Sequence, residues 1–464
     1  MEAPAVGQQS SNHSMVKPMV EPMAEPMVDL VIDPSPPSLP PAVVQALTEE
    51  QLQLLKQTWS LLLSAMAQAD VDAQKILDAP APAVAEPSKS SGWSMFRGMG
   101  GNSSVARPST TQLDSAASVD PPSTATAMAA DGSRPLVPAV SPPKVFPMLH
   151  ELGMAMHGEH PDIYILRFIR ARNWVPKDAT AMLINMLKWR ASFGVRQVLL
   201  EAEAPLYQPE LRRCQAYFSG VDRDGRICCC VHVCRHVASD LKRDLSEKHV
   251  VMTMESVCMM VVQNQLKEDT VTIVVDLRGF GLQHQDAVAT KFLLNTFQNY
   301  YPERLGKALI LSAPWLFSGF WQIIKPWLDP VVQAKVNFIS TQDLHQYIDP
   351  SQVVGVLGGD LPDYVYTVAP ETEVTALANL RASISEASKE ALWSEFKTSL
   401  DEFTEATLDW CKTVDAKGHS DRNAIAKKLQ RAYEHLSPII RTPSNYHRKG
   451  IQKDPAFKDI VTLV

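Results

Sequence analysis

The chain has 464 residues, of which 45% are hydrophobic and 20% charged, enough for one large domain with extensions or for two to three ordinary domains. Its formal net charge of −7 excludes a general electrostatic attraction to nucleic acid or to anionic membranes, so any anion must be bound by a local group of cations. No apolar run approaches the ~18 residues needed to cross a bilayer. The sequence predicts neither a secretory signal nor a lipid anchor.

The N-terminal part alternates between two kinds of composition. Residues 1–42 are rich in proline and methionine without a stable period, and we expect them to be disordered. Residues 43–78 are predicted to form a short helical segment, because Thr48 and Gln51 make a capping-box pattern before leucines and a tryptophan at helical spacing. Residues 79–143, rich in Pro, Ser, Ala and Gly, are predicted to be a disordered linker. An isolated helix between two such segments is expected to pack on the main domain.

The rest of the chain has the composition of a folded protein. Residues 144–205 are predicted to be a helical subdomain, with one helix starting near Asp162 and a second at Pro176. Residues 206–365 alternate between short apolar strands and helices, and residues 366–464 are predicted to be a helical extension with a basic end. The expected strands are 226–233, 271–277, 307–313 and 336–340, with helices near 245–265, 285–298 and 315–334. Nearly continuous apolar strands that alternate with helices predict an α/β domain with a mostly parallel sheet, covered on both faces.

The segment 300–335 is the most informative part of the sequence. Its predicted helix at 315–334 is apolar around most of its circumference and has one thin polar stripe. The stripe consists of Ser318, Gln322, Lys325, Asp329 and Gln333. A helix of this kind must be buried on several sides or must contact lipid.

Seven cysteines include three consecutive ones, Cys228, Cys229 and Cys230, whose side chains alternate between the faces of a strand. They predict reduced, buried thiols in the cytosol and no disulfide framework. Along the same strand, every second residue is a candidate ligand for a metal or a haem: Cys228, Cys230, His232, Cys234 and His236. The spacing of ~6.6 Å between such positions is wide for tetrahedral zinc. A haem needs only one or two axial ligands, so a haem- or metal-binding protein of the same fold stays open as a minor alternative.

The sequence does not predict an enzyme. It has no nucleophile elbow, no phosphate-binding glycine loop and no zinc-protease motif. The acidic residues Glu255 and Asp276 have ordinary roles available within a helix and at the end of a strand. We therefore expect no catalytic residues, no metal and no cofactor.

Six motifs in the same order resemble the CRAL-TRIO lipid-binding family, and within it the fungal phosphatidylinositol transfer proteins. The resemblance spans roughly residues 145–365. The motifs are ILRFIRARNW (165–174), DRDGR (222–226), VVDLRG (274–279), NYYPERLGK (299–307), APWLFSGFWQIIKPWLDPVVQAK (313–335) and VVGVLGGD (353–360). The family implies a helical N-terminal subdomain and a mostly parallel sheet that together enclose one lipid cavity.

In this family a mobile helix closes the cavity, and the resemblance places this gate at about 315–334. Its hinge matches Gly358 and Gly359. The apolar gate residues expected to cover the lipid, or to enter the membrane interface on opening, are Phe317, Phe320, Trp321, Ile324, Trp327, Leu328 and Val331.

The resemblance also implies a head-group site for an inositol phospholipid. Its acidic residue matches Glu303 and its two cations match Lys335 and Arg172. Lysine and arginine pair with a phosphodiester, and a carboxylate accepts hydrogen bonds from inositol hydroxyls. Two family positions depart from the pattern, because a lysine is replaced by Asn173 and a threonine by Val332. The alternative is that Glu303 and Lys335 form an ion pair that only stabilises the domain.

A second family site binds choline phospholipids through two tyrosines and a Ser/Thr pair. The matching residues, which we expect to line the cavity wall, are Phe218, Met254, Val271 and Ile273. All four lack a hydroxyl, so the cage for a quaternary ammonium group is replaced by an apolar wall. We expect the second ligand to be a sterol, a diacylglycerol or another weakly polar lipid, and not phosphatidylcholine.

The sequence therefore predicts a protein that binds phosphatidylinositol and transfers it between membranes in exchange for a weakly polar lipid. A lipid sensor that presents its ligand without transferring it is the alternative. We expect a cytoplasmic monomer that contacts membrane surfaces transiently, with a phospholipid ligand as its partner and no affinity for nucleic acid.

Overall fold

The structure is a computed structural model that describes residues 46–78, 147–236, 242–264, 266, 268–413, 419–461 and 463. The two segments expected to be disordered, 1–42 and 79–143, lie outside the described residues. The larger helices are α2 (Glu49–Asp78), α3 (Met148–Ala155), α4 (Pro161–Ala171), α5 (Pro176–Phe193), α6 (Val195–Glu201), α7 (Gln208–Arg212), α8 (Arg243–Gln263), α9 (Ala287–Tyr300), α10 (Phe317–Ile324), α11 (Pro330–Ala334), α12 (Glu371–Ser383), α13 (Glu386–Lys412), α14 (His419–Ile440) and α15 (Asn445–Arg448).

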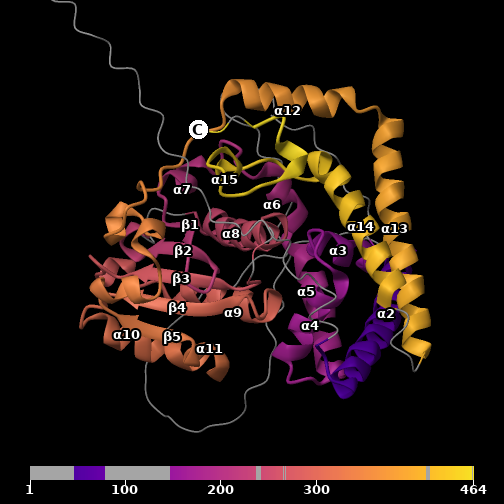
Figure 1. Cartoon of the computed structure of the whole chain (residues 1–464), viewed down its shortest axis with the longest axis horizontal. Coiled ribbons are helices and arrows are strands. Elements are labelled where there is room, and N and C mark those ends of the chain that lie inside the picture. Colours follow the sequence, from indigo (N-terminus) through magenta and orange to yellow (C-terminus); the bar gives the residue numbers. More distant parts are fainter. Residues whose placement is uncertain are drawn as a thin grey trace, which may run out of the picture.

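A five-stranded sheet forms one side of the molecule, and a group of helices forms the other (Figure 1). The strands are β1 (Ala216–Val221), β2 (Ile227–His232), β3 (Val271–Asp276), β4 (Leu305–Leu311) and β5 (Val336–Ile339). They lie in the order β1-β2-β3-β4-β5; β1 is antiparallel to β2, and the other neighbours are parallel. The prediction of a mostly parallel sheet in an α/β fold is confirmed.

The edge strand β1 was absent from the sequence-based prediction. Its pairing with β2 is interrupted between Phe218 and Val221, so its apolar residues do not form a regular run. Gly220 within this irregular stretch has a φ of +68°, and a Cβ there would lie 2.0 Å from the carbonyl oxygen of Gln352. Only glycine fits this conformation and close approach.

Both faces of the sheet are covered, which explains the continuous apolar character of its strands. On one face, Cys229 and Ile273 pack among residues of α8, and Ile310 packs under α10. On the other face, Cys228, Val274 and Leu309 pack against the segments that follow β5. The face under α8, α9 and α10 is the one that carries the predicted cavity wall and gate.

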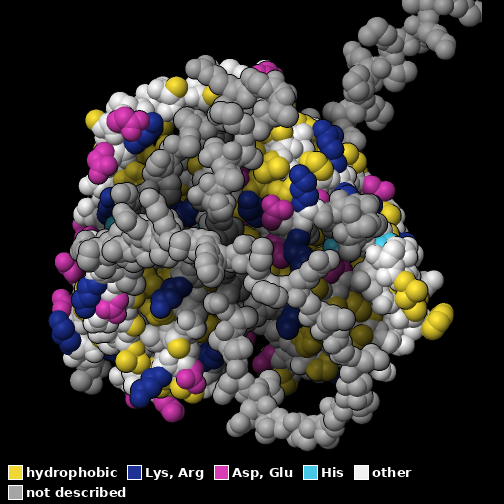
Figure 2. All heavy atoms as spheres, turned by 180° about the vertical axis from the view of Figure 1, so that it is seen from behind, with side chains coloured by type: hydrophobic (Ala, Val, Ile, Leu, Met, Phe, Trp, Pro, Cys, Tyr) yellow, Lys and Arg dark blue, Asp and Glu magenta, His cyan; other side chains and the backbone are white. Residues whose placement is uncertain are grey.

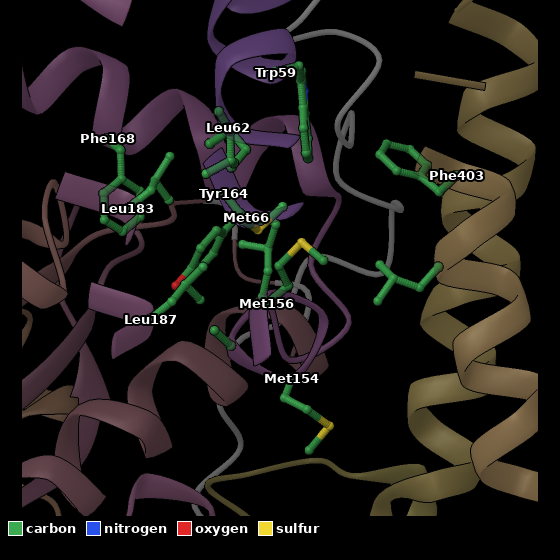
Figure 3. Packing of buried hydrophobic residues seen from close by; sticks show 14 of the residues in the cluster. Trp59, Leu62, Met66, Met154, Met156, Tyr164, Phe168, Leu183, Leu187 and Phe403 are labelled. Atoms are coloured by element: carbon green, nitrogen blue, oxygen red, sulfur yellow. The ribbon is translucent and has the colours of Figure 1, made fainter. Parts of the chain in front are cut away.

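The helical side of the molecule has its own core, to which the N-terminal helix α2 contributes (Figure 3). Trp59, Leu62 and Met66 of α2 are buried among side chains of α4, α5 and α13. The expected packing of this helix on the main domain is confirmed. It is also longer than the pattern at 48–67 suggested, since α2 continues to Asp78.

A buried charge joins three distant segments within this core. The indole Nε1 of Trp59 donates a 2.8 Å hydrogen bond to Asp162 Oδ1, and the guanidinium of Arg422 donates to both Asp162 oxygens at 2.7 and 2.9 Å. Burial acts to raise the pKa of Asp162, but Arg422 and the hydrogen bonds outweigh it and leave this pKa below its usual value. Asp162 thus links α4 to the N-terminal helix α2 and to the C-terminal helix α14.

The predicted gate is not one continuous helix. It consists of α10, a 3₁₀ turn (Lys325–Trp327) and the short α11, with Leu328 in an extended conformation between them. The physical reason is the pair Pro326 and Pro330, which lack the backbone N–H groups that a continuing helix would need. The expected polar stripe is therefore split, and its last two members belong to the second helical piece.

The face of the molecule shown in Figure 2 carries charges of both signs. Lys and Arg side chains are interspersed with Asp and Glu on the face shown in Figure 2. Within the described parts of the chain, no helix has the length and apolar character to cross a membrane.

Candidate functional site

The four residues predicted to line a cavity wall come together on the α8 side of the sheet. Phe218 of β1, Met254 of α8 and Val271 of β3 belong to one buried cluster, against which Ile273 packs. They come from three elements, because Val271 and Ile273 share β3. Strand β2 lies between β1 and β3 and pairs with both. The four residues thus form one apolar cluster inside the fold. That they line a lipid cavity stays a prediction.

Glu303 lies in the turn between α9 and β4, and buried anchors hold this turn on both sides. The hydroxyl of Tyr301 donates to Glu255 Oε1 within α8. The guanidinium of Arg304 donates to Glu159 Oε2 at 3.0 Å and to the Asp269 carbonyl at 3.1 Å. The turn is consequently fixed directly before and after the predicted head-group residue.

Glu303 itself has a φ of +58°, a left-handed conformation that costs free energy in a residue with a Cβ. Its carboxylate forms no hydrogen bond and no ion pair with any other residue that the structure describes. The alternative of a domain-stabilising ion pair between Glu303 and Lys335 is therefore wrong. A strained acidic residue without a protein partner is typical of a binding site.

The two predicted cations lie in different surroundings. The Nζ atom of Lys335 donates a 2.7 Å hydrogen bond to the carbonyl of Leu305, two residues after Glu303, so the structure brings Lys335 to the same turn. Arg172 follows the last residue of α4 and donates to the Ala171 carbonyl at 3.1 Å. It makes no hydrogen bond or ion pair with Glu303, and its place in a common site stays a prediction.

The gate segment packs its apolar side chains onto the edge of the sheet. Four of the seven predicted gate residues are buried there and two are half-buried. The buried ones are Phe317, Phe320, Ile324 and Leu328, and the half-buried ones are Trp321 and Trp327. Val331 differs from the prediction because its side chain is 55% exposed: α11 begins only at Pro330, after the break, and directs this residue outward.

Two glutamines satisfy the backbone groups that the break in the gate leaves free. Gln298 of α9 donates to the Trp327 carbonyl at 3.0 Å and accepts from the Asp329 N–H at 2.7 Å. Gln333 donates to the carbonyls of Lys325 and Leu328 at 3.2 and 2.9 Å. The predicted gate segment is thus held in its present position by a side chain from α9, in addition to apolar packing.

The outer surface of the gate and its neighbour β5 exposes large apolar side chains. Trp315 is 86% exposed, Ile323 54% and Phe338 48%. The ring of Phe338 packs against that of Trp321, with centroids 5.2 Å apart, so the exposed group continues into the buried gate contacts.

The two glycines of the predicted hinge are required for different reasons, one for its backbone conformation and one for a close backbone contact. Gly358 has a φ of +88°, which disfavours any residue with a Cβ. A Cβ on Gly359 would lie 2.1 Å from the Val353 carbonyl oxygen, so only glycine fits there. Motion about these residues stays a prediction.

The sequence reasoning missed a buried polar network behind the Glu303 turn. Its centre is Glu255 of α8, which is fully buried. Arg190 donates to both Glu255 oxygens at 2.6 and 3.0 Å, and His157 Nε2 lies 2.9 Å from one of them. His157 Nδ1 lies 2.8 Å from the hydroxyl of Tyr433, which connects the network to the C-terminal helix α14.

The charges in this network compensate each other. Burial acts to raise the pKa of Glu255, but Arg190 and His157 outweigh it and hold this pKa far below its usual range. Burial also lowers the pKa of His157, so that its imidazole is neutral near pH 7. The one sequence signal for the network was a glutamate within the apolar run of α8.

The proposed haem or metal ligands do not share a face of one strand. Strand β2 ends at His232, and a 3₁₀ turn (Val233–Arg235) breaks the alternation before Cys234 and His236. Both ring nitrogens of His232 are occupied, by Tyr217 at 2.9 Å and by Asp276 at 3.0 Å. Among the residues that the structure describes, no group of three or more Cys, His, Asp or Glu side chains has the geometry of a metal site.

The space left beside the apolar wall is small in this closed arrangement. A pocket between α4 and the turn after α9 has a volume of about 10 Å³, and one between α8 and the C-terminal segment has about 20 Å³. Sites for small-molecule ligands usually measure ~300–1,000 Å³. Neither pocket has room for a lipid chain in this structure.

Comparison with known proteins assigns the chain to a family. The model of the CRAL/TRIO domain matches residues 212–359, and that of the CRAL/TRIO N-terminal domain matches 143–185. The phosphatidylinositol transfer protein CSR1 of Eremothecium gossypii is 31% identical over 437 residues, which cover 88% of this chain and 98% of that protein. This chain belongs to the CRAL-TRIO family.

The comparisons also found a second curated relative and a solved structure. A CRAL-TRIO domain-containing protein of Schizosaccharomyces pombe is 32% identical over 307 residues, covering 64% of this chain and 67% of that protein. The crystal structure of Sfh5 is similar with a TM-score of 0.37 and 18% identity, over 48% of this chain and 81% of that one.

The chain thus belongs to a family of lipid-binding and lipid-transfer proteins. The matched CRAL/TRIO domain contains the apolar wall, the Glu303 turn, the gate and Lys335, while Arg172 lies in the matched N-terminal domain. The C-terminal helices α12, α13 and α14 lie beyond both domain models.

Proposed function

We propose that this protein binds phosphatidylinositol and transfers it between membranes. The observation that carries the proposal is the strained Glu303, whose carboxylate has no protein partner although its neighbours Tyr301 and Arg304 are firmly anchored. The buried contacts of Tyr301 and Arg304 hold Glu303 in this conformation, which leaves its carboxylate positioned for a ligand. The carboxylate accepts hydrogen bonds from the inositol hydroxyls.

The phosphodiester of the lipid is bound by Lys335 and Arg172. The Lys335 ammonium now bonds only a backbone carbonyl, an interaction that it exchanges for a charge-assisted bond to phosphate. Arg172 supplies a planar, permanently charged guanidinium from the N-terminal subdomain. The replacements at Asn173 and Val332 weaken this phosphate site relative to the family pattern without abolishing it.

The acyl chains lie along the apolar wall formed by Phe218, Met254 and Val271. Burying ~30 CH₂ groups at ~0.8 kcal/mol each is worth on the order of 20 kcal/mol. A bilayer offers nearly the same burial, so exchange between protein and membrane is close to thermoneutral and needs no ATP. The rate is then limited by the opening of the gate.

The exposed apolar group on the gate contacts the membrane while the lipid enters or leaves. Trp315 and Ile323 insert into the interfacial region, where aromatic and aliphatic side chains are stabilised. The apolar wall has no choline cage, so a weakly polar lipid and not phosphatidylcholine is the exchange partner. The protein performs no chemical reaction on either lipid and works as a monomer.

The test is mass spectrometry of the lipids that co-purify with the full chain, combined with transfer of labelled phosphatidylinositol between vesicles. We expect phosphatidylinositol among the bound lipids and transfer in proportion to protein. Absence of bound and transferred phosphatidylinositol would refute the proposal. Stable binding without transfer would favour the second candidate, a lipid sensor. The observation that favours a sensor is the pair of hydrogen bonds by which Gln298 holds the gate segment.

A further inference from the structure

A second site lies at the far end of the apolar wall, where the C-terminal segment crosses α8. The 20 Å³ pocket mentioned above is enclosed there by α7, α8, the start of β1 and the segments around 364–366 and 444–446. Although small, it exceeds the ~10–15 Å³ that one water-sized group requires. The pocket is lined by Glu203, Leu211, Ala216, His249, Met252, Thr253, Ser256, Tyr364, Tyr366, Ser444, Asn445 and Tyr446.

Two polar side chains of this pocket have buried atoms without a regular hydrogen bond to any residue that the structure describes. Neither ring nitrogen of His249 is accessible to solvent, although the residue as a whole is half-buried. The hydroxyl of Tyr366, a residue that is only 6% exposed, lies near the Glu203 carboxylate but makes no hydrogen bond of regular geometry with it. Buried polar groups of this kind cost about 1–3 kcal/mol each unless something pairs with them, so both point to a polar ligand atom.

The other polar groups of the pocket are already engaged. The hydroxyls of Thr253 and Ser256 donate to carbonyls of their own helix at 2.9 and 2.8 Å. The Glu203 carboxylate accepts hydrogen bonds from the Asn445 backbone and from Arg448. His249 and Tyr366 are therefore the groups available to a ligand.

No Lys or Arg side chain lines this pocket among the described residues. Burial lowers the pKa of His249 to about 4, which leaves the imidazole neutral at physiological pH, and Glu203 opposes an anion. Arg448 does not line the pocket, and its two terminal nitrogens donate to two carboxylates and a carbonyl. A neutral imidazole and a phenol both donate to and accept from a hydroxyl group, whereas a phosphate would meet no cation in the pocket.

The C-terminal segment connects this pocket to the apolar wall. Tyr446 lines the pocket and also packs its ring against Phe218, with centroids 5.4 Å apart. Asn445 donates to the Tyr364 hydroxyl at 2.7 Å, and Asn264 of α8 donates to the Ile451 carbonyl at 2.6 Å. The segment is thus held in place on both sides of Tyr446, between a polar pocket and a hydrocarbon surface.

We propose that this pocket binds the hydroxyl end of a weakly polar lipid, a sterol or a diacylglycerol, through His249 and Tyr366. The hydrocarbon part of that lipid lies past Tyr446 along the Phe218 and Met254 wall. The inference rests on the proposed function, since it names the site of the exchange lipid. It assigns a lipid-selecting role to the C-terminal segment, which lies outside the matched domain models.

The experiment measures binding of radiolabelled cholesterol and dioleoylglycerol, presented in vesicles, to the full chain. The hydroxyl-free sterol cholestene is the comparison ligand. Tyr366→Phe removes one hydroxyl and keeps the ring, so we expect binding of the hydroxylated lipid to weaken about 5- to 10-fold, while binding of cholestene is unchanged. His249→Leu is expected to weaken binding similarly, and His249→Gln, which keeps a donor and an acceptor, to retain most of it.

Tyr207→Phe is the matched control, because Tyr207 is also buried and its hydroxyl donates to Glu201 outside the pocket. Equal binding by wild type, Tyr366→Phe and His249→Leu would overturn the inference. So would a wild-type protein that carries phosphatidylinositol in the same vesicles but binds neither cholesterol nor dioleoylglycerol. Failure to carry phosphatidylinositol as well would refute the proposed function itself. Preference between the two labelled lipids identifies the source of the hydroxyl.

Discussion

The hydroxyl of Tyr301 donates a hydrogen bond to the carboxylate of Glu255, and this contact attaches the turn that carries Glu303 to the centre of α8. Glu255 in turn binds Arg190 of α5 and His157, which contacts α14. The position of the candidate head-group residue therefore depends on elements from the N-terminal subdomain, the sheet domain and the C-terminal extension together.

Replacing the centre of this network is expected to be costly. Glu255→Gln keeps the shape of the side chain but removes one of the two buried carboxylates that pair with Arg190 and leaves only Glu151, so we expect the free energy of unfolding to fall by about 3 kcal/mol. Urea denaturation measures this change. Glu402→Gln is the matched control, because Glu402 pairs with Lys428 at the exposed surface, and it should change stability by less than about 0.5 kcal/mol. Equal stability of both variants would contradict the argument.

The double variant Glu303→Ala/Lys335→Ala is expected to lose phosphatidylinositol transfer at least about tenfold, because several charge-assisted hydrogen bonds to the head group disappear. Its thermal stability should change little, since the Glu303 carboxylate has no protein partner. Vesicle transfer and thermal unfolding check the two statements. The control Glu402→Ala/Lys428→Ala removes a glutamate and a lysine that pair with each other at the exposed surface, and it should transfer normally. Normal transfer by the first variant would show that the head group is bound elsewhere.

Gln298 provides a test of the gate. Gln298→Leu removes the two hydrogen bonds between α9 and the break in the gate, each worth ~0.5–1.5 kcal/mol, so the open state should become about tenfold more populated. Faster amide hydrogen exchange in residues 317–334 is the expected readout. Gln322→Ala, at an exposed position on α10 of the same segment, serves as the control and should leave exchange unchanged. Unchanged exchange in both would mean that apolar packing alone closes the gate.

The N-terminal helix should depend on its buried contact with Asp162. Trp59→Phe removes the indole N–H donor and part of the packed volume, and we expect a loss of about 2 kcal/mol in unfolding free energy. Hydrogen exchange across residues 49–78 should also accelerate. Trp315→Phe makes the same replacement at a side chain that is 86% exposed and should have little effect. Identical behaviour of the two variants would argue against a stabilising role for this helix.

His249 should make the protein less stable in acid. Its pKa is lowered from 6.5 to about 4 by burial, so the unfolded chain binds a proton at this residue that the folded chain does not. Its contribution is fully present above pH 6.5 and is lost as the pH falls towards 4. At pH 5.5 the loss should be about 1 kcal/mol, and His249→Gln should remove that part of the pH dependence. Denaturation of both proteins at pH 7.5 and 5.5 measures the difference; equal slopes would mean that His249 titrates normally.

Much of the fold was predictable because its signals are local. Strands β2 to β5 are short apolar runs, and α4, α5, α8 and α9 follow helical spacing or carry a proline at the first turn. Strand β1 was missed, since its pairing is irregular around Gly220. The break in the gate was overlooked although Pro326 and Pro330 are visible in the sequence, because the apolar pattern runs through them without interruption.

The candidate site was predictable only where a motif carries it. The YPER turn indicated Glu303, and the resemblance indicated the wall residues, which do meet in one cluster. No motif indicated that Glu255 would be the centre of a buried network, or that Tyr446 would pack on Phe218 from a segment more than 200 residues away. Both depend on contacts across the chain.

The sequence by itself determined the order of strands and helices, the family and the position of the apolar gate, because periodicity and composition act over a few neighbouring residues. The tertiary structure alone decided which polar groups are paired and which are left without a partner. The candidate roles of Glu303, His249 and Tyr366 could be recognised only from the atoms around them. The free energy of a buried polar group depends on whether folding brings it a hydrogen-bond partner.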